Sequence, residues 1–368
     1  MRALMILTAV VSGGVLMVAA PAGAQSTAQP APAPLRAYVP TTISPEAAAI
    51  MAKQHAALLG PRPPAPNAAS FAVLYQFAER AMRSHEPELI KSMGLTVAER
   101  EMGGVPVLEV LPKDYKSDGT VLIYVHGGGF ILGSAHSSLH GAAIMANATG
   151  KRVISVDYTV APKGQWRLVT DQVIAVYKAV MAQGVAAARI GMFGESAGAS
   201  IISSTALKIR DQGLPMPGGL VLVSPATDLT GAGDTRVTLA DADPVLWPAA
   251  IQPGIDAYAP PADQKNPYVS SVYGDFTKGY PPTLILGGTK ELLLSDMVRL
   301  ERKIREAGGD VRLELYEGMP HAFPGLVLAA PEGKSAMREA VMFWNRHLAG
   351  GKGGRAKPQD RNRRAHSA

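Results

Sequence analysis

The chain has 368 residues, of which 47% are hydrophobic, contains no cysteine, and carries a formal net charge of +6 at pH 7. The length and apolar content suit one domain with a sizeable core, and the lack of cysteine excludes a disulfide framework and a lipoprotein anchor. The charge does not indicate a nucleic-acid-binding protein, because the excess comes from Arg2 and from the segment after residue 350, which leaves the body of the chain close to neutral.

The amino terminus has the pattern of a secretory signal peptide over residues 1–24. Arg2 precedes apolar runs, and residues 22–24 read Ala-Gly-Ala, which fits a cleavage site. The apolar stretch is interrupted by Ser-Gly-Gly at 12–14, which argues against a membrane anchor. We therefore expect cleavage before Gln25, export to the periplasm or medium, and no stable membrane insertion, because no other stretch is long and apolar enough to span a bilayer.

The rest of the chain divides by composition. Residues 25–44 begin with an Ala-, Pro-, Gln- and Ser-rich stretch and are predicted to be a linker. Residues 45–95 favour helix but are broken by Pro-Arg-Pro-Pro at 61–64, and they open a folded domain expected over 45–349. Residues 350–368 are basic and poor in apolar side chains, which predicts a disordered tail.

The first chemical motif follows a predicted buried strand. Residues 121–125, Val-Leu-Ile-Tyr-Val, read as a parallel strand and run directly into His-Gly-Gly-Gly-Phe at 126–130. A glycine run at a strand end lets backbone N–H groups face a ligand, and this form builds the oxyanion hole of some esterases. A phosphate-binding loop is the alternative, but no Walker lysine follows.

The second motif is Gly-Glu-Ser-Ala-Gly at residues 194–198. It follows a short apolar run at 190–193 and precedes a segment predicted to be helical over 199–209. Strand, sharp turn and helix form the context of a nucleophile elbow, in which Ser196 stands out of a strained turn. The pattern by itself is weak, and its weight comes from the other motifs and their order.

A histidine follows on the loop after a third predicted strand. Residues 311–316 alternate as a strand does, and Gly and Pro within 317–323 force a loop that carries His321. The remaining histidines lie in helices, tails or segments outside the predicted sheet. His136 and His140 are four apart, as metal ligands sometimes are, but no suitable third ligand is near, so we expect no metal site.

The acid is expected between Ser196 and His321. Residues 282–287 read as a strand, and Glu291 follows at the transition from strand to loop. Asp296, five residues later, is the alternative, and Ser295 or Asp296 is also a plausible N-cap of the helix predicted over 297–307. We favour Glu291.

These motifs, in this order, resemble the hormone-sensitive-lipase-like family of α/β hydrolases, also called bacterial esterase family IV. The similarity runs from about residue 70 to about residue 348, and includes Ala161-Pro162 and Ser224-Pro225 with Asp228. The resemblance implies an α/β-hydrolase fold, with a mostly parallel central sheet flanked by helices. It also implies a helical cap over the active-site mouth that includes residues 45–95.

Two features depart from the family pattern. Most relatives carry Asp at the acid position, whereas this chain has Glu291 followed by Leu292. The segment after Asp157 reads Tyr-Thr-Val-Ala-Pro-Lys-Gly-Gln-Trp rather than the usual continuation. Because that loop tends to lie near the site, the departure points to an unusual substrate preference.

The resemblance implies a serine carboxylesterase that cleaves short- to medium-chain acyl esters with water, through an acyl-enzyme and without a metal or organic cofactor. Ser196 is the nucleophile, His321 the general base and Glu291 the acid. Three backbone N–H groups are expected in the oxyanion hole, those of Gly127, Gly128 and Ala197. Three further residues are expected to support the loops: His126, Gly129 and Asp157.

Several alternatives stay open. Lactone, carbamate or amide cleavage would use the same residues, and a non-catalytic binding protein can occupy a hydrolase scaffold. A penicillin-recognising hydrolase is excluded, because no serine has lysine three residues later.

Family members often form homodimers through the last strand and helix, here near 311–315 and 335–348. Trp247, Tyr258 and Tyr273 are candidates for lining the acyl pocket, with core packing as the alternative.

Overall fold

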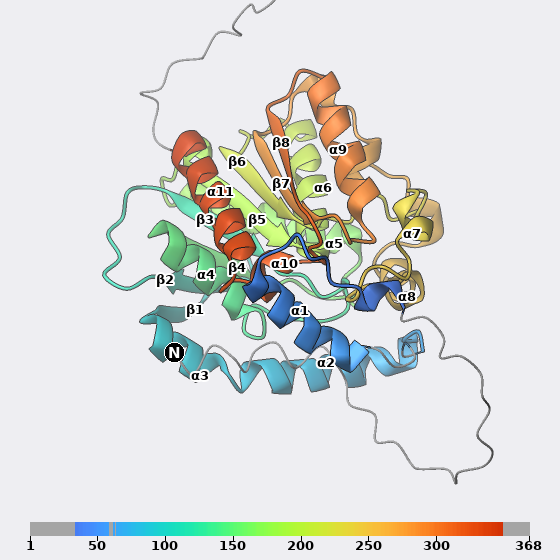
Figure 1. Ribbon diagram of the computed structural model, residues 1–368. Coiled ribbons are helices and arrows are strands. Elements are labelled where there is room, and N and C mark those ends of the chain that lie inside the picture. The colour runs from blue at the N-terminus through green and yellow to red at the C-terminus, as the bar shows by residue number, and fades with distance from the viewer. Residues whose placement is uncertain (1–33, 59–61, 63, 349–368) are drawn as a thin grey trace, which may run out of the picture.

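The computed structural model describes residues 34–58, 62 and 64–348 of the chain (Figure 1). The predicted signal peptide, the first part of the predicted linker and the predicted basic tail lie outside these residues. A short 3-10 helix, η2 (Leu35–Ala37), opens the described part.

An eight-stranded sheet forms the centre of the domain. Its strands stand in the order β1-β2-β4-β3-β5-β6-β7-β8. The pairs β1–β2 and β2–β4 are antiparallel, and every later pair is parallel. The strands are β1 (Thr96–Met102), β2 (Val105–Leu111), β3 (Val121–Val125), β4 (Arg152–Val156), β5 (Ile190–Glu195), β6 (Gly219–Val223), β7 (Thr283–Gly288) and β8 (Val311–Tyr316).

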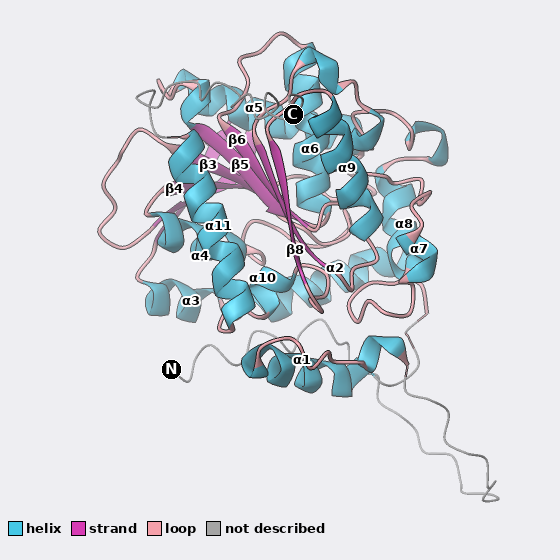
Figure 2. Cartoon of the chain, turned by 45° about the horizontal axis from the view of Figure 1, so that its top comes forward, coloured by secondary structure: helices cyan, strands magenta, loops and turns pink. Residues whose placement is uncertain are grey.

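Helices cover both faces of this sheet (Figures 1 and 2). The long ones after the first three are α4 (Leu139–Thr149), α5 (Trp166–Ala182), α6 (Ala197–Asp211), α8 (Pro248–Tyr258), α9 (Leu294–Glu306) and α11 (Pro331–His347). Two single-turn helices, α7 (Thr235–Thr238) and α10 (Phe323–Leu326), lie in the connections.

The buried strands divide their side chains between two hydrophobic layers. In β3, Ile123 joins the layer built with α5, α6 and α9, whereas Leu122 and Tyr124 join the layer built with α4 and α11. This alternation follows from the two-residue period of a strand. All five residues of β3 are buried, which explains why its sequence is a continuous apolar run rather than an alternating one.

Among the described residues, three α-helices precede the sheet: α1 (Pro45–Leu58), α2 (Ala68–Arg83) and α3 (Glu86–Met93). The break expected at 61–64 falls between α1 and α2, and Asn67 then caps α2 by accepting the backbone N–H of Ser70. In the described part of the chain, no helix is long and apolar enough to cross a membrane.

Most of the elements predicted from sequence are confirmed. The strands expected at 121–125 and 311–316 have these bounds, and those expected at 190–193 and 282–287 appear as β5 and β7. The antiparallel hairpin of β1 and β2 had not been predicted. Much of β1 is exposed and charged, so it lacks the apolar pattern that marks the inner strands.

Candidate active site

Ser196 stands on a sharp turn between β5 and α6. Its backbone has φ 53° and ψ −124°, a conformation that a residue with a side chain rarely adopts. Its N–H donates to Val223 O in β6 over 2.8 Å, which holds the turn against the sheet. A Cβ at Gly194 or Gly198 would lie 2.4 Å or 2.0 Å from Val125 O. The two glycines therefore let the turn pack directly on the end of β3.

Glu291 and His321 form a buried pair on neighbouring loops. Glu291 Oε2 lies 3.1 Å from His321 Nδ1, and these residues are 0% and 4% exposed. Glu291 Oε1 accepts the backbone N–H of Gly288 over 2.6 Å. Burial raises the pKa of Glu291, and the hydrogen bond and charge of His321 act in the opposite direction. The carboxylate at Nδ1 leaves Nε2 as the nitrogen free to face a reactant.

Asp296 lies in the first turn of α9, away from this pair. Its Oδ2 accepts the backbone N–H of Asp228 over 3.1 Å and lies 3.2 Å from Arg236 Nη2. Burial raises the pKa of Asp296, and the charge of Arg236 opposes this. The structure thus brings Glu291, and not Asp296, to His321.

Gly127 does not have the geometry expected of an oxyanion donor. Its N–H donates to Glu195 Oε1 over 3.0 Å, and the same oxygen accepts the hydroxyl of Tyr124 over 2.6 Å. An N–H with a good acceptor is not available to a substrate oxygen, so the expectation for Gly127 is corrected. Gly129, expected only to support the loop, lines the same pocket as Ser196 and Ala197.

The glycine run is held by side chains behind it. His126 Nδ1 lies 2.8 Å from Gly127 O, and the His126 ring stacks on Tyr158 with centroids 4.2 Å apart. Because a carbonyl oxygen only accepts, Nδ1 carries the proton. Burial lowers the pKa of His126, which favours the neutral ring. Asp157 Oδ1 accepts the N–H of Ala135 over 2.9 Å, which ties β4 to the loop beyond the glycines.

An apolar pocket opens at Ser196. Because its walls are nearly all hydrocarbon, they suit an acyl chain rather than a charged group. The lining residues are Gly129, Phe130, Ser196, Ala197, Ala226, Leu246, Ile251, Ile255 and Leu293.

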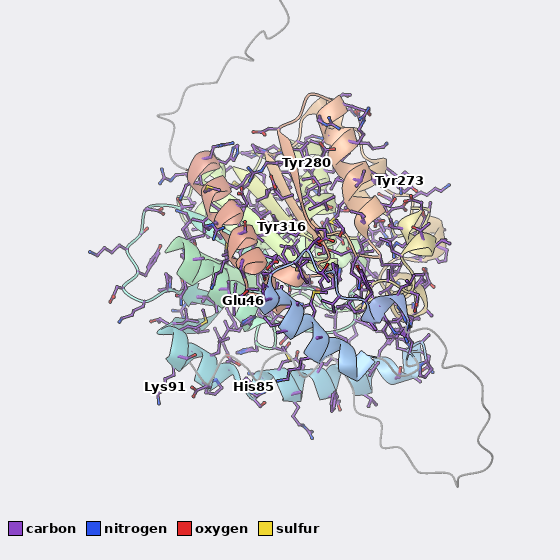
Figure 3. The ribbon with its side chains drawn as sticks, viewed as in Figure 1. Glu46, His85, Lys91, Tyr273, Tyr280 and Tyr316 are labelled. Atoms are coloured by element: carbon purple, nitrogen blue, oxygen red, sulfur yellow. The ribbon has the colours of Figure 1, made fainter. Side chains whose placement is uncertain are left out.

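The three aromatic candidates for this lining lie elsewhere. Tyr258 is buried and stacks on Phe130, with centroids 4.2 Å apart. Tyr273 lies beside α9 and bonds to the carboxylate of Asp228 (Figure 3). The guanidinium carbon of Arg62 lies over the Trp247 ring, 5.1 Å from the ring centroid. None of the three lines the pocket at Ser196, and Tyr258 packs in the core as the alternative predicts.

The histidine pair weighed as metal ligands is engaged differently. His136 Nδ1 lies 2.9 Å from Glu86 Oε1 in α3, and Nε2 lies 3.1 Å from Glu99 Oε1 in β1. Burial lowers the pKa of His140. Across the residues that the structure describes, no three His, Cys, Asp or Glu side chains assemble as a metal-binding group.

Two buried side chains near the pair escaped the sequence analysis. Ser224 Oγ donates to Glu291 Oε1 and accepts the N–H of Ala322, and its φ of 49° marks a strained backbone. Asp243 bonds to the N–H of Leu292, next to Glu291. Ser224 lay within a recognised motif but had no assigned role, and nothing in the local sequence distinguishes Asp243.

Comparisons with known proteins agree with this geometry. Residues 122–325 match the family described as alpha/beta hydrolase fold. An acetyl-hydrolase of Streptomyces hygroscopicus is 31% identical over 228 residues, which cover 62% of this chain and 76% of the relative. The crystal structure of an esterase, E25, superposes with a TM-score of 0.77 at 27% identity, covering 89% of this chain and 99% of that one. An esterase from the bacterial hormone-sensitive lipase family superposes with a TM-score of 0.71 at 27% identity, covering 83% and 99%.

Proposed function

The chain belongs to the α/β-hydrolase family, among esterases of the hormone-sensitive-lipase type, and hydrolyses carboxylic esters; we propose that it does so through a serine acyl-enzyme. The observation that carries the proposal is the buried pair of Glu291 and His321, 3.1 Å apart, in a domain whose strained elbow presents Ser196 to an apolar pocket. Nucleophile, acid and base follow one another in the chain order of this fold.

In the proposed reaction, Ser196 Oγ attacks the ester carbonyl and His321 accepts the hydroxyl proton. Glu291 holds the ring with Nδ1 protonated and stabilises the imidazolium. The imidazolium then protonates the departing alcohol, which leaves an acyl group on Ser196. Water, deprotonated by His321, attacks this acyl-enzyme, and the acid leaves as Ser196 regains its proton.

The proposed oxyanion donors are the backbone N–H groups of Gly128, Gly129 and Ala197. Gly128 and Gly129 have φ of 108° and 60°, which turn the peptide groups of the run, and Gly129 and Ala197 both line the pocket. Each donor directed at the developing oxyanion contributes about 3 kcal/mol to lowering the barrier in comparable sites. Gly127, whose N–H is bonded to Glu195, instead anchors the run.

The proposed substrates are esters of short to medium acyl chains. The pocket at Ser196 is lined by apolar groups, as an acyl chain requires, and one relative is an acetyl-hydrolase. A cap formed by α1, α2 and α3 is proposed; Glu79 of α2 and Glu86 of α3 contact Ser134 and His136 on the loop beyond the glycine run, which supports this for α2 and α3.

A chain-length series of chromogenic acyl esters tests this function directly. We expect residues 25–368 to hydrolyse the short esters and Ser196→Ala to lose at least about 10³-fold in kcat while remaining folded. Full activity of that variant would contradict the serine mechanism. A folded wild-type protein that is inactive on every ester but active on lactones, carbamates or amides would reassign the substrate.

Export is a separate proposal, supported by the sequence pattern of residues 1–24. Expression of the full chain in a bacterial host should release protein that begins at Gln25 into the periplasm or medium. Amino-terminal sequencing checks this, and a product that retains Met1 in the cytoplasm would contradict it.

A further inference from the structure

The buried hydroxyl of Ser200 lies between the proposed nucleophile and one wall of the pocket. Ser200 is in α6, four residues after Ser196, and is 2% exposed. Its Oγ lies 2.9 Å from Ser196 O and 2.8 Å from Ala226 N. Ala226 belongs to the connection that follows β6, and it is one of the residues that line the pocket at Ser196.

The partners of this hydroxyl fix the direction of both hydrogen bonds. The backbone N–H of Ala226 can only donate, so Ser200 Oγ accepts it, and the carbonyl oxygen of Ser196 can only accept, so it receives the hydroxyl hydrogen. Ser196 O also accepts the backbone N–H of Ser200 over 3.0 Å. The first turn of α6 therefore forms without the hydroxyl, and the bond to Ala226 is what the hydroxyl adds.

The position of Ala226 depends on this acceptor. Ala226 is 6% exposed, and a buried backbone N–H is costly when it has no partner. The neighbouring anchors of the same connection point elsewhere. Ser224 Oγ bonds to Glu291 on the acid loop, and Thr227 Oγ1 donates to Asp296 O in α9 over 2.8 Å. The bond through Ser200 is directed to α6 and to the nucleophile.

The connection after β6 thus reaches every member of the proposed triad. Ser224 joins the loop of the acid to the loop of the base. Two residues later, Ala226 is joined to Ser196 through Ser200. One short segment therefore sets both the spacing of acid and base and the spacing of nucleophile and pocket wall.

We propose that Ser200 is a positioning residue that holds the pocket wall at Ala226 in place relative to Ser196, and so sets which acyl chains the pocket accepts. This inference rests on the proposed serine mechanism. An acetyl group brings one methyl group to this wall, whereas a butyryl group must fit two further methylenes into the pocket. A wall that is no longer held therefore affects the two esters to different extents.

The test is steady-state kinetics of Ser200→Ala on chromogenic acetate and butyrate esters. Loss of the hydroxyl leaves the Ala226 N–H without its acceptor and releases the wall. We expect the ratio of kcat/KM for the two esters to change at least about 3-fold from wild type, with kcat/KM on the better ester about 10-fold lower. A wild-type ratio in a folded Ser200→Ala variant would overturn the inference.

Ser203→Ala is the matched control. Ser203 lies on the same helix and is 0% exposed, but its Oγ bonds to Ser200 O over 3.0 Å and to Ser271 Oγ over 2.7 Å. Because these bonds reach neither Ser196 nor Ala226, this variant should lose stability and keep the wild-type ratio. A ratio that changed equally in both variants would show that loss of any buried hydroxyl of α6 disturbs the pocket, and would overturn the specific role of Ser200.

Ser200→Thr and Ser200→Val form a second pair that does not depend on the alanine variant folding. The two side chains have nearly the same shape, but threonine keeps a hydroxyl that donates and accepts, whereas valine has a methyl group in its place. The threonine variant should stay near the wild-type ratio, and the valine variant should depart from it as Ser200→Ala does. Equal ratios in the two variants would overturn the inference.

Failure of the serine mechanism would be seen separately, by treating the wild-type protein with a serine-directed sulfonyl fluoride and locating the label by mass spectrometry. Ester hydrolysis by a protein that takes no label on Ser196 would contradict the serine mechanism itself. A labelled Ser196, together with an unchanged ester ratio in Ser200→Ala, would overturn only the role of Ser200.

Discussion

Ser224 donates its hydroxyl hydrogen to Glu291 Oε1 over 2.8 Å. The same oxygen atom of Ser224 accepts the N–H of Ala322 over 3.0 Å, so one buried hydroxyl joins the loop of the acid to the loop of the base. Both loops follow strands that are neighbours in the sheet, β7 and β8. The distance between Glu291 and His321 thus depends on a residue that follows a third strand, β6.

Removal of the Ser224 hydroxyl tests whether the Glu291–His321 geometry depends on it. Ser224→Ala leaves a buried carboxylate oxygen and a backbone N–H each short of a partner, which costs about 1–3 kcal/mol of stability. We expect kcat/KM to fall by at least about 10-fold, mainly through kcat. Ester hydrolysis and thermal denaturation measure the two effects. Ser204→Ala is the control, because Ser204 is equally buried but its hydroxyl has no hydrogen-bond partner, and this variant should keep full activity.

Glu291→Gln and Asp296→Asn should have different consequences. The first keeps the shape of the side chain but no longer favours the required tautomer and charge of His321, so kcat should fall by roughly 10²- to 10⁴-fold. The second leaves Arg236 without its buried partner and should cost about 3 kcal/mol of stability, with a much smaller loss of kcat. Steady-state kinetics and denaturant unfolding separate these outcomes. The reverse ranking in kcat would make Asp296 the acid.

Glu195 should act as a tether for the oxyanion loop. Its Oε1 accepts both Tyr124 Oη–H and the Gly127 N–H. Glu195→Ala removes that acceptor and frees the glycine run, so kcat should fall about 10- to 100-fold with little change in KM. Glu195→Gln keeps an amide oxygen at the same place and should retain most activity when assayed at pH 8. Equal losses in both variants would argue that charge, rather than the tether, is what matters.

His126 should make the folded protein sensitive to acid. Its pKa is lowered by burial, so the unfolded chain binds a proton more readily than the folded one. The stability that neutral His126 contributes is therefore fully present above an ordinary imidazole pKa of about 6.5 and is lost as the pH falls through the folded value. Compared with His126→Gln, the wild type should have a larger advantage in unfolding free energy at pH 8 than at pH 5.5. An advantage that is constant with pH would contradict this.

Local sequence patterns predicted those parts of the site that are each contained in one short segment of the chain. The buried strand at 121–125, the glycine run after it, the elbow at Ser196 and the loop of His321 are all readable because backbone geometry demands these residue types in sequence. Glycine is needed at 194 and 198 because the turn packs on Val125 O, and this requirement is visible in the chain as Gly-x-Ser-x-Gly.

Contacts between residues far apart in the chain could not be predicted as well from the sequence. Glu291 and Asp296 are both acidic, both follow the same strand and both are buried, so spacing favoured one without excluding the other. The Gly127 N–H was expected to bind substrate until Glu195, 68 residues away, proved to accept it. The roles of Ser224 and Asp243 had no local signal, because a single polar residue acquires a partner only when distant loops meet.

The sequence by itself determined the fold class, the order of nucleophile, acid and base, and the family, since each depends on contiguous residues that must satisfy local backbone geometry. Only the tertiary structure decided which carboxylate reaches His321, which glycine N–H groups are free, and which side chains surround Ser196. Those outcomes depend on how the parallel strands of the sheet bring the loops at their carboxyl ends together. There, side chains and backbone groups tens of residues apart in the chain come within hydrogen-bonding distance.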